Sequence, residues 1–383
     1  MAKVEVREFT PAEMRHHRSE KWRDAPADVL PLPVAEMDFE IAEPIRNLLI
    51  EMVQRSDLGY LGPIPELGIT FAKFAKNRWQ WTLDPEQIHT VTDVGVGVVE
   101  VLRLFTKPGD KVLISSPVYH NFYTWVNETG VEKVDVPFLQ NKNGWEIDFD
   151  GIKQAYKSGI KVHILCSPHN PIGRVYLKDE LLQIAQLAHE HGVVVISDEI
   201  HAPLTFAEST FIPFLSLGPV AQGVGVTITA ASKAWNIAGL KCAIVVTQND
   251  AMSKRISALP PATHYRASLL GAFATATAFA DCEPWLDAVL EKLDSNRRFL
   301  KKILNEKLPT VRYEIPECSY LAWIDLASLN LGENPTKVLL EKGKVSFNPG
   351  HTFGPHTGQF TRLNFATSQN VLTQAVDRMV QAL

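Results

Sequence analysis

The sequence predicts an α/β protein: a large domain whose mostly parallel seven-stranded sheet is flanked by helices, and a smaller α+β domain. Short Val- and Ile-rich runs alternate with helical patterns between residues 88 and 247, which is typical of parallel strands buried on both faces. Beyond residue 250, long helical stretches come first and short strands follow. We therefore expect a large domain over residues 46–280 and a small domain formed by residues 1–45 and 281–383.

Individual elements follow from the same patterns. The seven strands expected in the large domain are Ile88–Thr92, Lys111–Ser115, Val131–Val136, Val162–Cys166, Val193–Ser197, Val224–Thr229 and Cys242–Thr247. Helices are expected at Pro44–Ser56, from Glu66 to Trp79, and at Val98–Thr106, Asn121–Thr129, Asp148–Lys157 and Lys178–His191. Those of the small domain are Trp285–Leu308 and Gln369–Ala382, with strands at Tyr320–Asp325, Val345–Phe347 and Arg362–Phe365. The run Pro31–Phe39 is expected to be extended, since proline fixes φ and disfavours helix before it.

Composition excludes several classes of protein. A formal net charge of −5 and a pI near 6.2 argue against a nucleic-acid or polybasic membrane surface, which needs concentrated Lys and Arg. No run of 18 apolar residues could span a bilayer, and the charged N-terminus is unlike a signal peptide. The four cysteines are scattered without a CxxC pair, so we expect free thiols in the cytoplasm and no metal site.

Candidate ligand-binding residues follow the predicted strands, because ligands of open parallel sheets bind beyond the carboxyl ends of strands. After the first strand come Val94 and Gly95, where glycine and a helix N-terminus together suit a phosphate. Tyr119 could stack on a ring or simply pack in its loop. Asn170 could donate a hydrogen bond to a ligand oxygen or only form a turn.

Two charged residues complete this set. Asp198 ends a buried strand, where a carboxylate is costly unless it meets a cation or a donor. Lys233 follows another strand among Ala and Ser residues, and burial there would lower its pKa as a Schiff-base lysine requires; the alternative is a surface lysine after an ordinary strand. A phosphate site, a stacking ring, a donor, an acid and a lysine together indicate pyridoxal 5′-phosphate (PLP).

Several motifs make the chain resemble a known family over nearly its whole length. The sequence resembles the fold-type-I, aspartate-aminotransferase-like PLP enzymes, and within them most closely the PatB/MalY-type carbon–sulfur lyases, which include cystathionine β-lyases. The motifs that carry the resemblance are PVAEMDF (33–39), SPHNPIG (167–173), SDEIHAPL (197–204), SKAWNIAGLK (232–241), FNPGHTFG (347–354) and RLNFA (362–366).

The resemblance implies a role for each matching position. Lys233 would form the Schiff base with PLP and act as the catalytic base, Asp198 would pair with the ring nitrogen, and Tyr119 would stack on the ring. The phenolic oxygen would bind Asn170, with His201 also at the cofactor. The remaining implied contacts are Val94, Gly95, Ser232 and Lys241 to the phosphate, Tyr60 to the phosphate of the neighbouring subunit, and Arg362 and Ala35 to the substrate. A structural alternative for Arg362 is an ion pair that anchors the small domain.

Three positions depart from the pattern common among transaminases of this superfamily. His201 replaces a tyrosine, as in the lyase subgroup, which leaves its role open. Lys241 replaces an arginine and offers a point charge instead of a bidentate fork. Ala230 replaces a serine and removes one phosphate ligand.

The function implied is PLP-dependent β-elimination on cystathionine or other S-substituted cysteines, releasing a thiol, pyruvate and ammonia, by a homodimer with shared sites. A rival is an aminotransferase, which shares every cofactor residue. Another is a regulatory protein that holds PLP and binds a partner. The sequence does not identify the leaving group.

Overall fold

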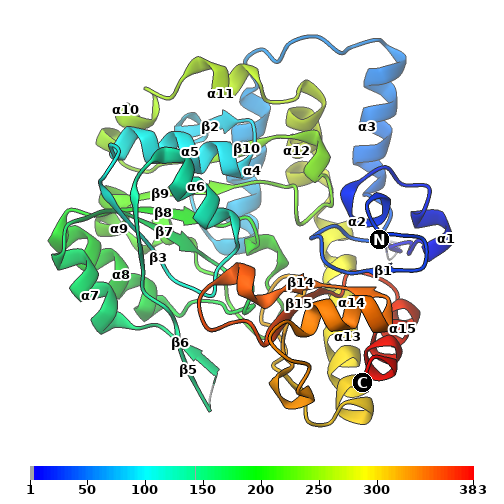
Figure 1. Ribbon diagram of the computed structural model, residues 1–383. Helices are drawn as coiled ribbons and strands as arrows, with labels where there is room; N and C mark the ends of the chain where they lie inside the picture. The colour runs from blue at the N-terminus through cyan, green and yellow to red at the C-terminus, as the bar shows by residue number, and fades with distance from the viewer. Residues whose placement is uncertain (1–3, 143) are drawn as a thin grey trace.

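A seven-stranded sheet forms the centre of the computed structural model, which describes residues 4–142 and 144–383 (Figure 1). The strand order is β2-β10-β9-β8-β7-β3-β4. Their bounds are β2 (Ile88–Val91), β3 (Lys111–Ile114), β4 (Glu132–Asp135), β7 (Ile160–Cys166), β8 (Val194–Asp198), β9 (Gly225–Thr229) and β10 (Ala243–Val246). All seven predicted strands are present. Strand β10 runs antiparallel to both neighbours, and the other adjacent pairs are parallel.

Helices cover both faces of this sheet (Figure 1). They are α4 (Pro65–Trp79), α5 (Val94–Phe105), α6 (Asn121–Thr129), α7 (Phe149–Lys157), α8 (Lys178–His191), α9 (Pro219–Val224), α10 (Asp250–Ile256), α11 (Pro261–Tyr265) and α12 (Leu269–Asp281). Helix α5 packs against β8, β9 and β10, whereas α8 packs with α7 and α9. The predictions for α6 and α8 match the observed bounds. Within the described residues, no helix is long and apolar enough to cross a membrane.

A second, antiparallel sheet of four strands lies beside the first, in the order β11-β12-β15-β14. Its bounds are β11 (Arg312–Tyr313), β12 (Leu321–Asp325), β14 (Asn348–Pro349) and β15 (Phe360–Asn364), and the neighbouring helices are α13 (Glu283–Lys307), α14 (Pro335–Gly343) and α15 (Gln369–Gln381). Strand β1 (Leu30–Pro31) pairs with β13 (Val345–Ser346). This pairing supports the proposal that residues 1–45 belong with the C-terminal part of the chain.

Some elements were absent from the sequence-based prediction. The hairpin of β5 (Leu139–Asn141) and β6 (Gly144–Glu146) projects from the sheet (Figure 1). Its strands are three residues long and β5 is exposed, so no alternation of apolar and polar residues marks them. Helix α5 begins at Val94, four residues before its predicted start, because the Asp93 side chain accepts from the Val96 N–H at 2.8 Å and caps it.

The N-terminal segment includes a strap, residues 33–39, that follows α1 (Pro11–Met14), α2 (Glu20–Arg23) and β1 and precedes α3 (Glu43–Gln54). The prediction of an extended run is wrong at Val34, Ala35 and Asp38, where the strap bends, and the Glu36 N–H donates to the Val34 oxygen at 2.9 Å. A buried ion pair holds the strap in this shape. The Lys21 Nζ lies 2.9 Å from the Asp38 Oδ1, with side chains that are 0% and 2% exposed. The Trp22 Nε1 donates to the same oxygen at 2.8 Å. Asp38 therefore fixes one end of the strap.

Removing the charge of Asp38 should destabilise the protein. In Asp38→Asn the buried Lys21 ammonium loses its counter-ion, and breaking such a pair typically costs about 3–5 kcal/mol of unfolding free energy. Urea denaturation should measure this loss. Glu51→Gln, which breaks the exposed Glu51–Arg55 pair of α3, should cost under about 1 kcal/mol. Equal effects of the two substitutions would contradict the role given to Asp38.

Candidate functional site

The polar strand ends and the strap enclose a cavity of about 550 Å³. Eleven of the twelve sequence-predicted site residues line it: Ala35, Val94, Gly95, Tyr119, Asn170, Asp198, His201, Ser232, Lys233, Lys241 and Arg362. The parallel strands β7 and β8 deliver Asn170 and Asp198 to this edge, and β9 delivers Lys233. Tyr60 lies outside the cavity and is 96% exposed. One chain thus brings together every predicted residue except Tyr60.

One end of the cavity suits an anion. Helix α5 begins there, and the N–H groups of Val94 and Gly95 lie in its first turn, where they have no intrahelical acceptor. A side chain at Gly95 would bring its Cβ within 3.0 Å of the Trp125 Nε1, so only glycine leaves this space open. Lys241 adds a positive charge nearby, with its Nζ 3.2 Å from the Asp93 Oδ2. These groups fit a phosphate.

Lys233 lines the cavity and is half-buried. Its Nζ donates to the main-chain oxygen of Ala35 at 3.2 Å. Burial lowers the pKa of Lys233 to about 8, and the Arg362 guanidinium lowers it further, while the Glu36 carboxylate acts in the opposite direction. The amine is therefore far easier to deprotonate than an ordinary lysine.

Asp198 is buried at the end of β8 and accepts a hydrogen bond from the Ile200 N–H at 3.2 Å. Burial raises the pKa of Asp198 to about 7, against the lowering effects of the Ile200 N–H and the Lys233 charge. Among the described residues it forms no ion pair. A buried carboxyl in this position fits a ligand that brings its own positive charge or N–H.

Arg362 is 3% exposed, yet the described chain offers it no carboxylate. Its Nη1 donates to the Asn170 Oδ1 at 3.0 Å, and its Nη2 donates to the Asn348 Oδ1 at 2.7 Å and the Pro33 oxygen at 3.3 Å. Its Nε has no partner. The guanidinium also lies over the Phe353 ring, 4.9 Å from its centroid. A buried guanidinium whose hydrogen bonds go to neutral oxygens is suited to receiving an anion, and among the described residues the anchoring ion pair considered as its alternative is not formed.

The aromatic and imidazole groups complete the lining. The Tyr119 hydroxyl accepts from the Asn121 Nδ2 at 2.9 Å. Burial lowers the pKa of His201 to about 3, and the charges of Lys233 and Arg362 act in the same direction. Because His201 is neutral and its buried Nδ1 has no partner, it can donate or accept one hydrogen bond but does not supply a charge.

Sequence reasoning missed several residues of the site. No role was predicted for Asn348 of the FNPGHTFG motif, although its Oδ1 accepts a hydrogen bond from Arg362. Tyr320 donates to the Ala35 oxygen at 3.0 Å, and Trp125 and Glu36 line the cavity. Its position inside this motif, close to Gly350, is a signal that could have identified Asn348. No local pattern distinguishes Tyr320 or Trp125 from core aromatics, because their roles depend on contacts far along the chain.

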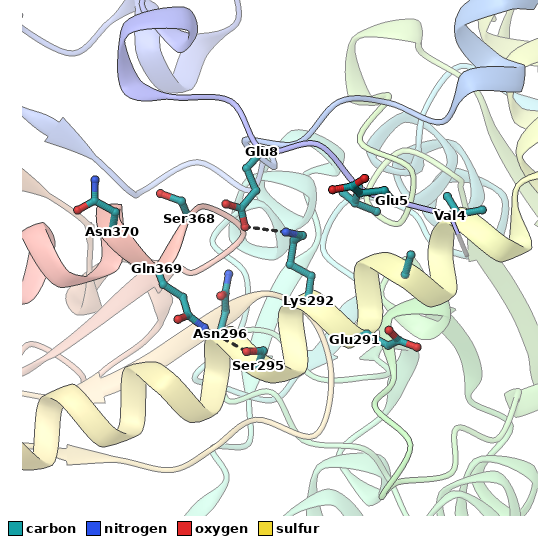
Figure 2. Close-up of a pocket in the computed structure, with 12 residues that line it drawn as sticks. Val4, Glu5, Glu8, Glu291, Lys292, Ser295, Asn296, Ser368, Gln369 and Asn370 are labelled. Carbon is teal, nitrogen blue, oxygen red and sulfur yellow. Dashed lines mark hydrogen bonds and ion pairs between the residues drawn. The ribbon is translucent and has the colours of Figure 1, made fainter. Parts of the chain in front are cut away.

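A second cavity, of about 640 Å³, lies between the N-terminal segment, α13 and the start of α15 (Figure 2). It contains none of the predicted site residues. Its polar groups bind one another, with Lys292 2.8 Å from Glu8 and Gln369 3.1 Å from Ser295. We place the functional site in the first cavity, where Lys233, Asp198 and Arg362 form no ion pairs with other described residues. No group of three possible metal ligands occurs among the described residues, and all four cysteines are buried and free.

Comparison with known proteins agrees with this geometry. A family model described as aminotransferase class I and II matches residues 27–379. The cystathionine β-lyase of Corynebacterium glutamicum is 34% identical over 97% of this chain and 98% of its own length, and the cystathionine β-lyase PatB of Bacillus subtilis is 33% identical over 93% of each. The structure of cystalysin from Treponema denticola, which contains a pyridoxal 5′-phosphate cofactor, superposes with a TM-score of 0.93 at 28% identity over 99% of both chains.

The raised pKa of Asp198 leads to a prediction about the stability of the cofactor-free protein. Its folded-state pKa of about 7 lies above the unfolded value of about 3.9, so it destabilises the fold increasingly as pH rises from about 4 to 7. Asp198→Asn removes that contribution. Relative to the unaltered chain, the variant should therefore gain about 2–3 kcal/mol of unfolding free energy between pH 5 and pH 8. Urea denaturation at both pH values tests this, and a difference that does not change with pH would contradict it.

Proposed function

The chain belongs to the aminotransferase class I and II family, and on that premise we propose that it is a PLP-dependent carbon–sulfur β-lyase acting on S-substituted L-cysteines. The observation that carries the choice of reaction is the end-to-end similarity to two cystathionine β-lyases. The cavity supports it with a lysine of lowered pKa, a buried acid and an unpaired buried arginine.

The residues present fit PLP. The first-turn N–H groups of α5, at Val94 and Gly95, would hold the phosphate with Ser232 and Lys241. Asp198 would meet the ring nitrogen and keep it protonated, since a charged partner would compensate its burial. The Asn170 Oδ1 is engaged by Arg362, which leaves its Nδ2 to donate to the phenolic oxygen.

Two further contacts concern the ring. Tyr119 would pack on its face, and His201 would contact it as a neutral group. Lys233 would bind PLP covalently through its Nζ. When bound, the cofactor supplies an electron sink for the pair left at Cα after proton removal.

In the proposed reaction, the chain's residues bind the substrate and move one proton. Arg362 receives the α-carboxylate in a bidentate contact, helped by its unpartnered Nε. The uncharged Nζ of Lys233 accepts the Cα proton, and its lowered pKa keeps a useful fraction uncharged near neutral pH. The Cβ–S bond then breaks, and with one water the net products are a thiol, pyruvate and ammonia.

The reaction type is tested with L-cystathionine. Homocysteine, pyruvate and ammonia should appear in equal amounts without a keto-acid acceptor. Lys233→Ala should lower kcat by about 10²–10⁴-fold, the usual contribution of a catalytic base. Lys292→Ala, at the lysine of the other cavity, is the matched control and should retain activity. A requirement for a keto acid in the native enzyme would favour the aminotransferase.

A homodimer with shared sites is also part of the proposal. Exposed apolar side chains gather around the loop that carries Tyr60, including Val53 and Leu58, which are 55% and 57% exposed. A second copy that covered this surface would remove apolar area from water, and Tyr60 would then reach the phosphate in the neighbouring subunit.

Sedimentation should give a particle near twice the 42.7 kDa chain mass. Tyr60→Phe should keep the dimer but weaken PLP binding about tenfold, since one hydrogen bond to a charged phosphate is lost. Tyr265→Phe, at another exposed tyrosine, should leave PLP affinity unchanged. A fully active monomer would refute the role of Tyr60.

A further inference from the structure

The main-chain oxygen of Ala35 accepts hydrogen bonds from two side chains. One donor is the Lys233 Nζ at 3.2 Å, and the other is the Tyr320 hydroxyl at 3.0 Å. Tyr320 is fully buried, immediately before β12. A carbonyl oxygen has two lone pairs, so the tyrosine and the lysine together use the full acceptor capacity of this atom.

The strap that carries Ala35 is held from both sides of the cavity. Asn236, three residues after Lys233, accepts from the Met37 N–H at 2.9 Å and donates to the Met37 oxygen at 3.0 Å. Asn364, two residues after Arg362, donates to the oxygens of Val34 and Glu36 at 2.7 and 2.6 Å. These four hydrogen bonds fix the backbone on either side of Ala35 independently of Tyr320.

We propose that the Ala35 carbonyl is the acceptor that holds the Lys233 amine whenever the amine is not bonded to the cofactor, and that Tyr320 is a positioning residue that shares this carbonyl. The proposal rests on the proposed function, because it concerns the amine as a base. It adds a resting place for the amine and assigns Tyr320 a part in setting how readily the amine binds a proton.

A carbonyl suits this purpose better than a carboxylate. The charged groups around Lys233 are Arg362 and Lys241, which disfavour the ammonium form, and Glu36 and Asp198, which favour it. His201 also faces it and is uncharged. A carboxylate in direct contact would stabilise the ammonium strongly, whereas a neutral oxygen orients the amine with a smaller effect on its pKa. A second donor on that oxygen reduces the effect further.

The test uses cofactor-free protein and one residue-specific readout. Reductive methylation with formaldehyde and cyanoborohydride, followed by peptide mass spectrometry, gives the labelling rate of Lys233 across pH. Tyr320→Phe should move the midpoint of this curve upward by about half a pH unit. The ammonium then no longer shares the Ala35 oxygen, and a shift of this size corresponds to the net free energy of one hydrogen bond. The strap keeps its position through Asn236 and Asn364.

A second variant should shift the midpoint of the Lys233 labelling curve in the opposite direction. Asn236→Gly removes both hydrogen bonds to Met37, and glycine suits its backbone, which has φ of 57°. Asn364 and Tyr320 alone then hold the strap near Ala35, so the hydrogen bond from the amine to the Ala35 oxygen should loosen and the midpoint for Lys233 should fall. In the loaded enzyme, the acid limb of the kcat profile should shift in the same direction as each midpoint, with KM changed less than about twofold because Arg362 is untouched.

Tyr313→Phe is the matched control. Tyr313 is also buried, but its hydroxyl has no hydrogen-bond partner, so the labelling curve of Lys233 should not move. Curves for Tyr320→Phe and Asn236→Gly that both superpose on that of the native chain would overturn the proposal. If the curves shift but neither native protein nor variants cleave S-substituted cysteines, the positioning role stands and the proposed function fails.

Discussion

The site depends on the burial of three ionisable groups that do not pair with one another. Lys233, Asp198 and Arg362 line one cavity, and in the part of the chain that the structure describes none of them forms an ion pair. Burial raises the pKa of Asp198 and lowers the pKa values of Lys233 and Arg362, so it favours the neutral form of each group. Such an arrangement costs stability in the absence of a ligand. A cofactor that bonds covalently to Lys233 and brings a protonated ring nitrogen to Asp198, together with a substrate carboxylate at Arg362, would compensate all three.

The fold supports this arrangement with two rigid frames. The parallel strands β7, β8 and β9 bring their carboxyl ends to one edge, which is where Asn170, Asp198 and Lys233 follow. Strand β15, of the other sheet, carries Arg362. The strap joins the two sheets, because Asn236, which follows β9, and Asn364, at the end of β15, both form hydrogen bonds to its backbone. The separation of Lys233 and Arg362, the proposed base and carboxylate receptor, is therefore set by hydrogen bonds from asparagine side chains to the backbone of the strap.

The sequence was sufficient for the strands and for the residues directly after them, because buried parallel strands leave continuous Val and Ile runs and their ends are marked by polar residues. It was insufficient where a role depends on distant contacts. Tyr320 has the same local pattern as a core tyrosine, and only the position of the Ala35 oxygen distinguishes it. The start of α5 was predicted four residues late, at Val98, because the sequence pattern did not reveal that Asp93 caps a helix that begins at Val94. The Tyr60 side chain forms no hydrogen bond to any other described residue, so its role stays a prediction, as does the division into domains.

The strap has a consequence for the order of events during synthesis. Its residues leave the ribosome long before the side chains that hold it, because Asn236 comes 199 residues after Met37 and Asn364 comes 330 residues after Val34. Contacts so distant in sequence form late in folding. The amine of Lys233 therefore has no fixed acceptor until nearly the whole chain has been translated. A nascent chain can therefore complete its central sheet, whose last strand ends at Val246, well before it can assemble the site.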